Sequence, residues 1–297
     1  ENDHIITSVS EHNSVLRPLH YLKEKGVEVS YIGVSEKGVL NFEEIPSLIK
    51  ANTKAIVLTH ASNVTGNITD LKKYGDFCRN NNLLFVVDAS QTAGAFNIDM
   101  KEMNVDVLCF TGHKSMLGPQ GTGALCVREE VYIRPFMVGG SGTHSYDEFQ
   151  PDKMPTRLEA GTLNSHGIAG LHASIDYILR NKMENLTNKA MELARKFYDG
   201  VTKFPEVKVY GDFETDLRAP IVSLNISDMD SSEVSNILYE EYKISTRPGA
   251  HCAPLIHKAL GTVEQGMVRF SFSHSNTFEE VELAINAIKK IIDDRRE

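Results

Sequence analysis

The chain has 297 residues, of which 41% are hydrophobic and 24% charged, and its formal net charge is −9. This length suits one large α/β domain with a smaller appendage, or two domains. The negative charge argues against a nucleic-acid partner, because phosphate binding needs a basic face. The sequence shows no signal peptide and no apolar run long enough to span a bilayer, so we expect a cytoplasmic protein without a membrane partner.

The four cysteines, Cys78, Cys109, Cys126 and Cys252, form no CxxC pair. Four cysteines in so long a chain do not make a disulfide framework, so a reducing compartment is expected. No metal site is expected.

The first half alternates short apolar runs with amphipathic stretches, which predicts a mostly parallel sheet flanked by helices. Strands are expected at residues 4–9, 27–34, 54–60, 83–90, 105–112 and 122–129. Helices are expected at residues 14–26, 41–52 and 70–82. In the third helix, one face carries Leu71, Tyr74, Phe77 and Cys78. Since a strand begins at residue 4 with almost no lead-in, we expect the sequence to begin partway through a domain.

From about residue 164 the pattern changes, and longer helices are expected at residues 166–179 and 185–201. Beyond them we expect two strands and two helices, at residues 219–227, 231–243, 266–273 and 277–297. Thr277 and Glu280 have the spacing of a capping box at the start of the last helix. The sequence therefore predicts an α/β fold with an N-terminally incomplete large domain at 1–182 and a small α+β domain at 183–297.

Three of the predicted strands end in polar groups. These groups are Asn63, then Asp88 and Gln91, and then Thr111, His113 and Lys114. In open parallel sheets, ligands collect at the carboxyl edge of the strands. If the three strands are neighbours, the polar side chains converge on one crevice.

The set has a chemical logic. A buried lysine loses its proton more easily, and its neutral amine forms a Schiff base with an aldehyde. A strand-end carboxylate such as Asp88 would hold a protonated pyridine nitrogen. Asn63 and Gln91 would bind a ring hydroxyl, and Thr111 and His113 a phosphate. Together they describe a site for pyridoxal 5′-phosphate.

Each residue alone also has a simpler interpretation. An aspartate at a strand end is often a cap, and a lysine in a glycine-rich loop is usually solvated. Asn63 suits a turn. The spacing alone leaves both interpretations open.

Several segments carry a more specific signal. They read, in order, SEHNS, ASNVTG, VDASQTAG, TGHKSMLGPQGTGAL, RLEAGTLN, RPGAHCAP and RFSFSHSNT. Through them the chain resembles the class V aminotransferase family of fold-type I pyridoxal phosphate enzymes, and within it the cysteine desulfurases, with selenocysteine lyases close by. The segments span nearly the whole chain in the order of the family.

The resemblance implies a role for each candidate in the cofactor site. Lys114 would carry the Schiff base and move protons, and Asp88 would pair with the pyridine nitrogen. His12 would stack on the ring, although it also suits the start of a helix. Asn63 and Gln91 would contact the O3′ side. Thr111 and His113 would bind the phosphate, and Thr162 would reach the phosphate of a neighbouring subunit, which implies a homodimer.

For the sulfur chemistry, the resemblance points to Cys252 in a Pro/Gly-punctuated loop. The nearby Arg247 and His251 would favour the thiolate form of Cys252. The alternative for Cys252 is an exposed thiol with no function, and His251 also suits a structural role. Arg269 matches the arginine that holds the substrate carboxylate, against the alternative of a strand-edge surface charge. Arg247 would assist in substrate binding.

The implied reaction converts L-cysteine to L-alanine with a persulfide on Cys252, which an acceptor protein or thiol then collects. The alternatives are a selenocysteine lyase, another class V lyase or aminotransferase, and a truncated non-catalytic scaffold of the same fold. The scaffold is an alternative because the family normally has a further N-terminal phosphate-binding turn, which is not found before His12. Pro248 and Ala250 make the match of the cysteine loop incomplete.

Overall fold

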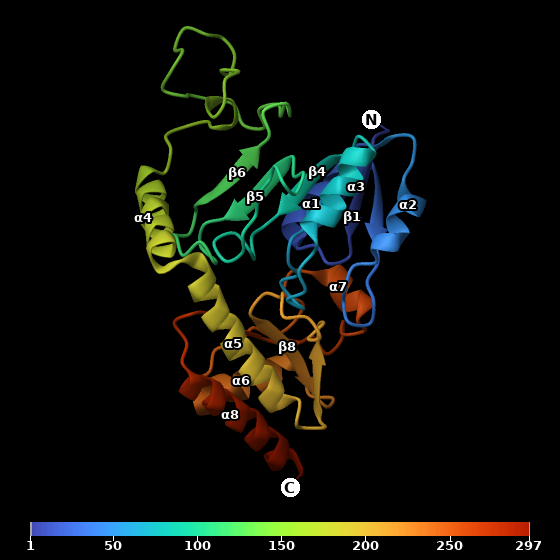
Figure 1. Ribbon diagram of the computed structural model, residues 1–297, viewed down its shortest axis with the longest axis vertical. Coiled ribbons are helices and arrows are strands. Elements are labelled where there is room, and N and C mark those ends of the chain that lie inside the picture. The colour runs from blue at the N-terminus through green and yellow to red at the C-terminus, as the bar shows by residue number, and fades with distance from the viewer. Residues whose placement is uncertain (1, 297) are drawn as a thin grey trace.

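The computed structural model describes residues 2–296 and shows a large sheet above a smaller one (Figure 1). The strand order of the large sheet is β2-β1-β3-β4-β5-β6, with β1 to β5 parallel and β6 antiparallel to β5. Its strands are β1 (His4–Ser8), β2 (Glu28–Ile32), β3 (Thr53–Thr59), β4 (Leu84–Asp88), β5 (Val107–Thr111) and β6 (Gly123–Val127). The predicted mostly parallel α/β sheet is confirmed.

Helices α1 (Asn13–Glu24) and α3 (Leu71–Asn80) each begin at a side-chain cap. At α3, Asp70 accepts a hydrogen bond from the backbone N–H of Lys73 at 3.0 Å, which satisfies one of the free donors of the first turn. The apolar face of α3 is confirmed, with Leu71, Tyr74 and Cys78 buried in the core of the sheet.

The short helix expected at 41–52 is confirmed in its first part only. A 3₁₀ turn at Phe42–Glu44 leads into a four-residue helix, α2 (Ile45–Leu48), which contains Pro46. Ile49 already has extended backbone angles, with φ −65° and ψ 131°. The apolar residues of this segment fill the space beside α3, where Phe42 packs edge-on against the Tyr74 ring at 5.0 Å.

A long segment without regular strands, residues 128–164, leaves the sheet after β6 and projects away from the body of the molecule (Figure 1). It contains one 3₁₀ turn, Thr156–Leu158, and several exposed apolar side chains. Helix α4 (Ser165–Asn181) returns from it, and Lys182 at φ +60° joins α4 to α5 (Met183–Val201).

The second sheet is antiparallel, with the order β7-β8-β9. Its strands are β7 (Val207–Tyr210), β8 (Ile221–Ile226) and β9 (Val268–Ser271), and its helices beyond α5 are α6 (Ser231–Tyr242), α7 (Pro254–Ala259) and α8 (Phe278–Arg296). β8 is buried along its whole length. Its apolar side chains share one core with Phe197 of α5, Leu238 of α6 and Ile288 of α8. This separate core supports the proposed domain boundary after residue 182.

The start of α8 confirms the predicted capping box. The backbone N–H of Thr277 donates to Glu280 Oε2 at 3.0 Å, and the N–H of Glu280 donates to Thr277 Oγ1 at 3.2 Å. Two donors of the first turn are therefore satisfied reciprocally.

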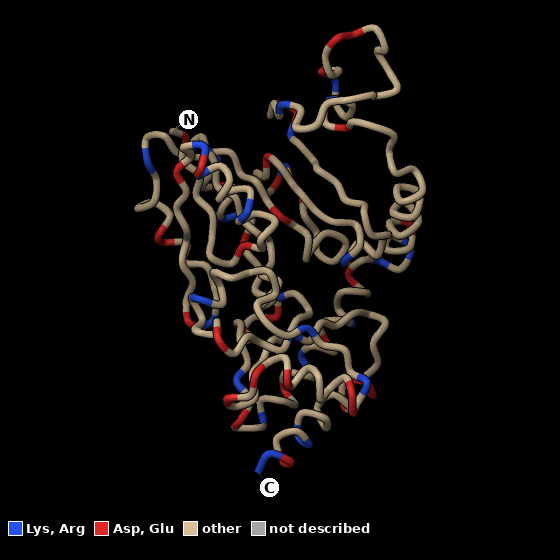
Figure 2. The backbone as a smooth tube through the Cα atoms, turned by 180° about the vertical axis from the view of Figure 1, so that it is seen from behind, with Lys and Arg blue, Asp and Glu red and all other residues tan. Residues whose placement is uncertain are grey.

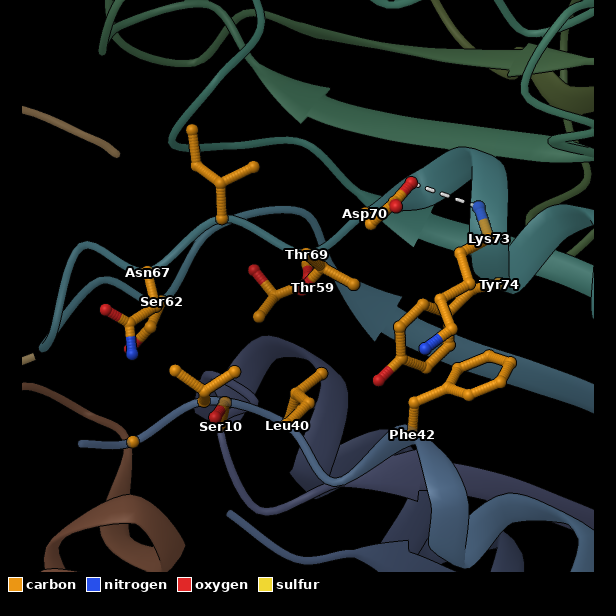
Figure 3. A pocket seen from close by; sticks show the side chains of 13 residues that line it. Ser10, Leu40, Phe42, Thr59, Ser62, Asn67, Thr69, Asp70, Lys73 and Tyr74 are labelled. Carbon is orange, nitrogen blue, oxygen red and sulfur yellow. Dashed lines mark hydrogen bonds between the residues drawn. The ribbon is translucent and has the colours of Figure 1, made fainter. Parts of the chain in front are cut away.

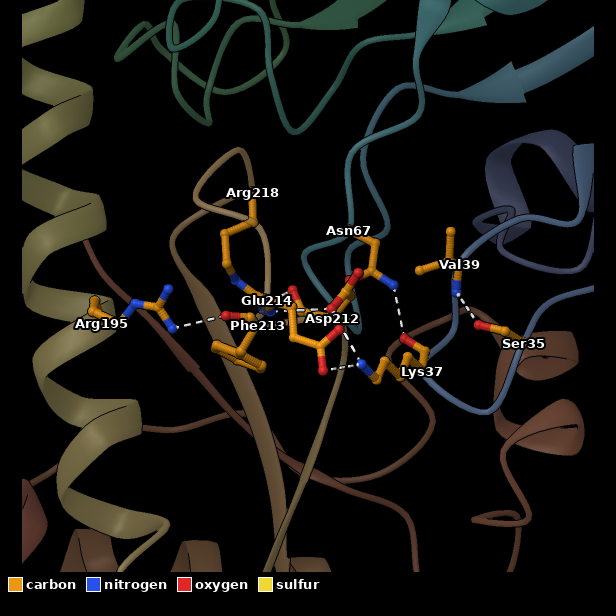
Figure 4. A network of polar contacts seen from close by, with 9 residues as sticks. All are labelled: Ser35, Lys37, Val39, Asn67, Arg195, Asp212, Phe213, Glu214 and Arg218. Atoms are coloured by element: carbon orange, nitrogen blue, oxygen red, sulfur yellow. Dashed lines mark hydrogen bonds and ion pairs between the residues drawn. The ribbon is translucent and has the colours of Figure 1, made fainter.

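Polar contacts join the two sheets (Figure 4). Asn67, in the loop after β3, accepts a hydrogen bond from the N–H of Asp212 at 2.8 Å. The buried Arg218 donates to Thr65 O at 2.7 Å, and Ser223 of β8 donates to Val64 O at 2.5 Å. The loop after β3 is thus fixed to the second sheet, which brings β9 and its preceding loop to the edge of the large sheet.

Acidic and basic residues are dispersed along the backbone of both parts of the molecule (Figure 2). Within residues 2–296, the structure has no helix with both the length and the apolar composition needed to cross a membrane.

Candidate functional site

The carboxyl ends of β3, β4 and β5 lie side by side. Thr59 pairs with Asp88, and Asp88 pairs with Cys109 on the next strand. The N–H of His60 donates to Asp88 O at 2.9 Å, which continues the ladder past the end of β3. Since Lys114 follows β5 closely, the polar groups predicted at three strand ends do share one edge of the sheet.

Lys114 lies half-buried in the turn between β5 and β6. Burial lowers the pKa of its amine, the negative charge of Asp88 opposes this shift, and the positive charges of Arg269 and Arg247 add to it. The amine is therefore easier to deprotonate than that of a surface lysine, as a nucleophile requires.

The Lys114 turn packs closely on the turn that follows β4. Gly94 has φ +83°, and a Cβ atom there would lie 2.6 Å from Ser115 O. Ser115 Oγ in turn lies 3.5 Å from Gln91 O. Glycine at 94 therefore permits the close approach that holds the Lys114 turn against the residues following Asp88.

His12 is the N-cap of α1, which was the simpler of its two interpretations. Its Nδ1 accepts a hydrogen bond from the N–H of Ser14 at 3.1 Å, so the proton of the neutral ring is on Nε2. Burial, followed by the positive charge of Lys114, lowers the pKa of His12, while Asp88 raises it. The cap fixes a neutral aromatic ring within the electrostatic field of Lys114 and Asp88, so this role is compatible with stacking on a cofactor.

Glu11, next to His12, is a further candidate that the sequence pattern did not identify. It is fully buried, and its Oε1 accepts hydrogen bonds from Ser8 Oγ at 2.5 Å and from the N–H of Thr59 at 3.0 Å. Burial raises the pKa of Glu11 to about 8, and the charge of Asp88 contributes to the rise. Only the residue's position beside His12 hints at this role, because a single glutamate before a helix usually suggests a solvated cap.

Cys252 lies exposed in the loop between α6 and α7, in a left-handed conformation with φ +57°. Its carbonyl accepts a hydrogen bond from the N–H of Asn13 at 2.7 Å, which places this loop at the start of α1 beside His12. Arg247 Nη2 donates to Cys252 Sγ at 3.3 Å. Cys78 is buried, and Cys109 and Cys126 are partly buried on strands, as expected.

Arg247 and Arg269 pair through their backbones, with N···O distances of 2.9 and 3.2 Å. Arg269, on β9, donates from Nη1 to Asn63 O at 3.0 Å, and its buried Nε has no partner in the described part of the chain. Burial lowers the pKa of Arg269, and Arg247 adds to the shift. Two cationic guanidinium groups beside Cys252 suit a small substrate with a carboxylate.

Asn63 is buried, and its Nδ2 donates to His251 O at 2.8 Å. The Asn63 amide nitrogen thus holds the Cys252 loop. The predicted contact with a cofactor O3′ atom stays a prediction, and Asn63 Oδ1 is the atom that would make it.

Thr111 and His113 come together at the end of β5, where Thr111 Oγ1 lies 2.7 Å from His113 Nδ1. Thr162 is exposed in the segment between β6 and α4, and within the described chain it makes no hydrogen bond to the other candidates. Its predicted role involves a second subunit and stays a prediction.

A cavity of about 280 Å³ lies between α3 and the loops that follow β1, β2 and β3 (Figure 3). It shares Thr59 with the surroundings of Glu11, and its lining includes neither Lys114 nor Cys252. Tyr74 OH points into it, and burial raises the pKa of this hydroxyl. The cavity is therefore distinct from the edge that carries the candidate residues.

A half-buried lysine near a strand-end carboxylate, on a mostly parallel sheet with a small α+β domain, is the arrangement of fold-type I pyridoxal phosphate enzymes. The chain belongs to the aminotransferase class-V family, whose model matches residues 1–283. A protein described as a probable cysteine desulfurase from Methanothermobacter thermautotrophicus is 33% identical over 296 residues, covering 98% of this chain and 74% of the relative. The cysteine desulfurase IscS of Klebsiella pneumoniae is 30% identical over 303 residues, covering 99% and 71%.

Solved structures of cysteine desulfurases are also similar to this chain. An apo cysteine desulfurase from Thermococcus onnurineus has a TM-score of 0.92 and 33% identity, covering 99% of this chain and 74% of that one. The cysteine desulfurase CsdA of Escherichia coli, in an S-sulfonic acid form, has a TM-score of 0.90 and 28% identity, covering 98% and 72%. The resemblance inferred from the sequence segments is confirmed.

Enzymes of this family use pyridoxal 5′-phosphate, and the residues of this chain fit that group. Lys114 offers an amine with a lowered pKa, and Asp88 offers a carboxylate on the same strand edge. Near them, the buried Nε of Arg269 has no hydrogen-bond partner within residues 2–296 and could donate to the carboxylate of a cofactor-bound substrate.

Proposed function

We propose that the protein is a pyridoxal phosphate-dependent cysteine desulfurase, which converts L-cysteine to L-alanine and receives the sulfur on Cys252. The observation that carries the proposal is the contact of Arg247 with Cys252, beside a half-buried Lys114 near Asp88. The names of the relatives support the same activity.

Different residues of the chain have separate roles in cofactor binding, substrate binding and proton transfer. Asp88 would hold the cofactor's protonated ring nitrogen, and His12 would stack on the ring. When bound, the cofactor withdraws electrons from the substrate Cα and so makes its proton acidic. Arg269 binds the substrate carboxylate with its forked guanidinium. The Lys114 amine, which is easily deprotonated, removes the Cα proton and later returns it.

Cys252 performs the sulfur step. Its thiolate attacks the sulfur of the substrate, so a new S–S bond forms while the substrate's carbon–sulfur bond breaks. The electron pair of the broken bond passes to the substrate carbon, which is then protonated, and alanine leaves. Arg247 stabilises the thiolate before attack, because it donates a hydrogen bond to Sγ.

A homodimer and a sulfur acceptor complete the proposal. Three aromatic side chains of the projecting segment, Phe136, Tyr146 and Phe149, are between 83% and 102% exposed, as an unpaired interface would be. Thr162 lies in the same segment and would reach the phosphate of the partner copy. The exposed Cys252 would pass its sulfur to an acceptor protein or thiol in the cytoplasm. Light scattering on the protein as it elutes from a size-exclusion column measures its molar mass and so tests the dimer.

The activity is tested by supplying the protein with pyridoxal 5′-phosphate, a thiol reductant and L-cysteine. We expect alanine and sulfide in equal amounts. The parallel reaction with L-selenocysteine separates a desulfurase from a selenocysteine lyase. Absence of alanine from the cysteine reaction contradicts the proposal.

A further inference from the structure

Two buried histidines stack on each other at the Cys252 loop: His251 belongs to the loop and His257 lies on α7, and the proposed mechanism uses neither. His251 and His257 are 2% and 1% exposed. Their rings are nearly parallel, with an interplanar angle of 12° and centroids 5.4 Å apart. His251 Nδ1 lies 3.2 Å from His257 Nε2, which joins the loop to the short helix α7.

The hydrogen-bond partners fix where the protons are. His251 Nε2 lies 2.9 Å from the carbonyl of Arg247, which only accepts, so this nitrogen carries a proton. Burial lowers the pKa of His251 to about 4, so the ring is neutral and its Nδ1 accepts. His257 Nε2 must therefore donate to it.

The same reasoning continues to Thr262. Since His257 Nε2 carries the proton of a neutral ring, its Nδ1 is the accepting nitrogen. Burial lowers the pKa of His257, and a hydrogen bond with the backbone of Thr262 opposes this shift. Thr262 Oγ1 lies 2.9 Å from that Nδ1 and 3.4 Å from the carbonyl of His257, so its hydroxyl donates along the shorter contact. One directed chain runs from Thr262 through both rings to the carbonyl of Arg247.

The chain of hydrogen bonds holds a strained loop. His251 and Cys252 both have left-handed backbones, with φ +53° and +57°, which non-glycine residues adopt only where their surroundings enforce it. The carbonyls of the two residues are held by Asn63 Nδ2 and by the N–H of Asn13. The His251 ring adds the link back to Arg247, whose guanidinium donates to Cys252 Sγ.

We propose that His257 is a positioning residue for Cys252. By donating to His251 Nδ1, it fixes the tautomer and orientation of that ring, and the ring holds the loop so that Sγ meets the guanidinium of Arg247. The inference rests on the proposed function in one respect, namely that Cys252 is the thiol that accepts sulfur.

The test compares His257→Leu, which removes both ring nitrogens, with His257→Gln, whose amide nitrogen can replace the Nε2 donor. Exposed His172 on α4 provides the matched controls His172→Leu and His172→Gln. Two quantities are measured in the cofactor-loaded proteins. One is the rate of Cys252 alkylation by iodoacetamide at pH 7, resolved by peptide mass spectrometry, and the other is kcat for alanine formation.

We expect His257→Leu to slow both alkylation and kcat about tenfold, because a directed contact to a thiolate is lost. His257→Gln should stay within about threefold of the parent protein, and the control variants should match it. Should His257→Leu fail to fold, Thr262→Val removes one link of the chain at equal volume, and we expect it to slow alkylation severalfold.

The proposal is overturned if the folded Leu and Val variants alkylate at the parent rate, or if Leu and Gln cause equal losses, which would indicate packing alone. A failure of the proposed function would give a different result: Cys252→Ser would still produce sulfide and alanine from L-cysteine. The alkylation comparison decides the role of His257 in either case.

Discussion

The guanidinium Nη2 of Arg247 lies 3.3 Å from Sγ of Cys252, and the backbone of Arg247 pairs with that of Arg269. Through Arg247, Cys252 in its irregular loop is linked to Arg269 on strand β9 of the second sheet. A thiol and the guanidinium proposed to bind a substrate carboxylate are thereby held together, as a reaction on the sulfur of an amino acid requires.

Replacing Cys252 with serine removes the thiol proposed to receive sulfur and leaves the candidate cofactor-binding residues in place. We expect loss of sulfide and alanine production, together with an unchanged cofactor absorbance spectrum. Cys126→Ser, on strand β6, is the matched control and should keep its activity. Normal desulfuration by the Cys252 variant would assign the sulfur step to another group.

Replacing Arg247 with glutamine removes the cationic donor to Cys252 Sγ. We expect alkylation of Cys252 at pH 7 to slow by about three- to tenfold, since a hydrogen bond to a thiolate at an exposed position contributes about 1 kcal/mol. The control is Arg180→Gln at the end of α4. An alkylation rate equal to that of the parent would mean that the contact does not activate the thiol.

Glu11 predicts a dependence of stability on pH. Its pKa rises from 4.5 to about 8 in the folded chain, so the native state binds more protons than the unfolded state between these values. The free energy of unfolding should therefore fall as pH rises from about 4.5 to 8. Glu11→Gln removes this contribution. In denaturant unfolding, the free energy of unfolding of the variant should therefore rise relative to that of the parent protein as pH increases across this window. A difference that is constant with pH would refute the buried, protonated state.

Gly94→Ala tests the close approach that positions Lys114. The added Cβ would lie 2.6 Å from Ser115 O at φ +83°, so both contact and backbone are strained. Gly26→Ala has φ +88° and open space around the Cβ, and it isolates the backbone effect. We expect Gly26→Ala to cost about 1 kcal/mol of stability and Gly94→Ala clearly more, with weakened cofactor binding only in the latter. Equal effects on cofactor affinity would contradict the positioning role of Gly94.

The strands of the large sheet and the positions of the polar residues that follow them could be predicted from the sequence, because both signals are local. Buried runs such as 83–90 and the polar groups that follow them are read directly from hydrophobic pattern. In the second domain, β7 and α7 were not predicted. β7 has four residues and α7 has six, which is fewer than two helical turns, so both are too short for a distinctive hydrophobic repeat.

Glu11 and His257 could not be assigned in the same way, since their roles arise from contacts between distant segments. Glu11 binds the N–H of Thr59, 48 residues along the chain. His257 acts through His251, which Asn63 also holds from 188 residues away. Only the folded arrangement distinguishes these side chains from a solvated carboxylate and an ordinary core histidine.

The central claim is that the amine of Lys114 reacts with a phosphorylated aldehyde at the strand edge that carries Asp88. The most direct measurement is reduction with borohydride after addition of pyridoxal 5′-phosphate, followed by peptide mass mapping. The account predicts a stable phosphopyridoxyl group on Lys114, and no label at that peptide in Lys114→Ala. Labelling spread over surface lysines, with Lys114 unmodified, would contradict it.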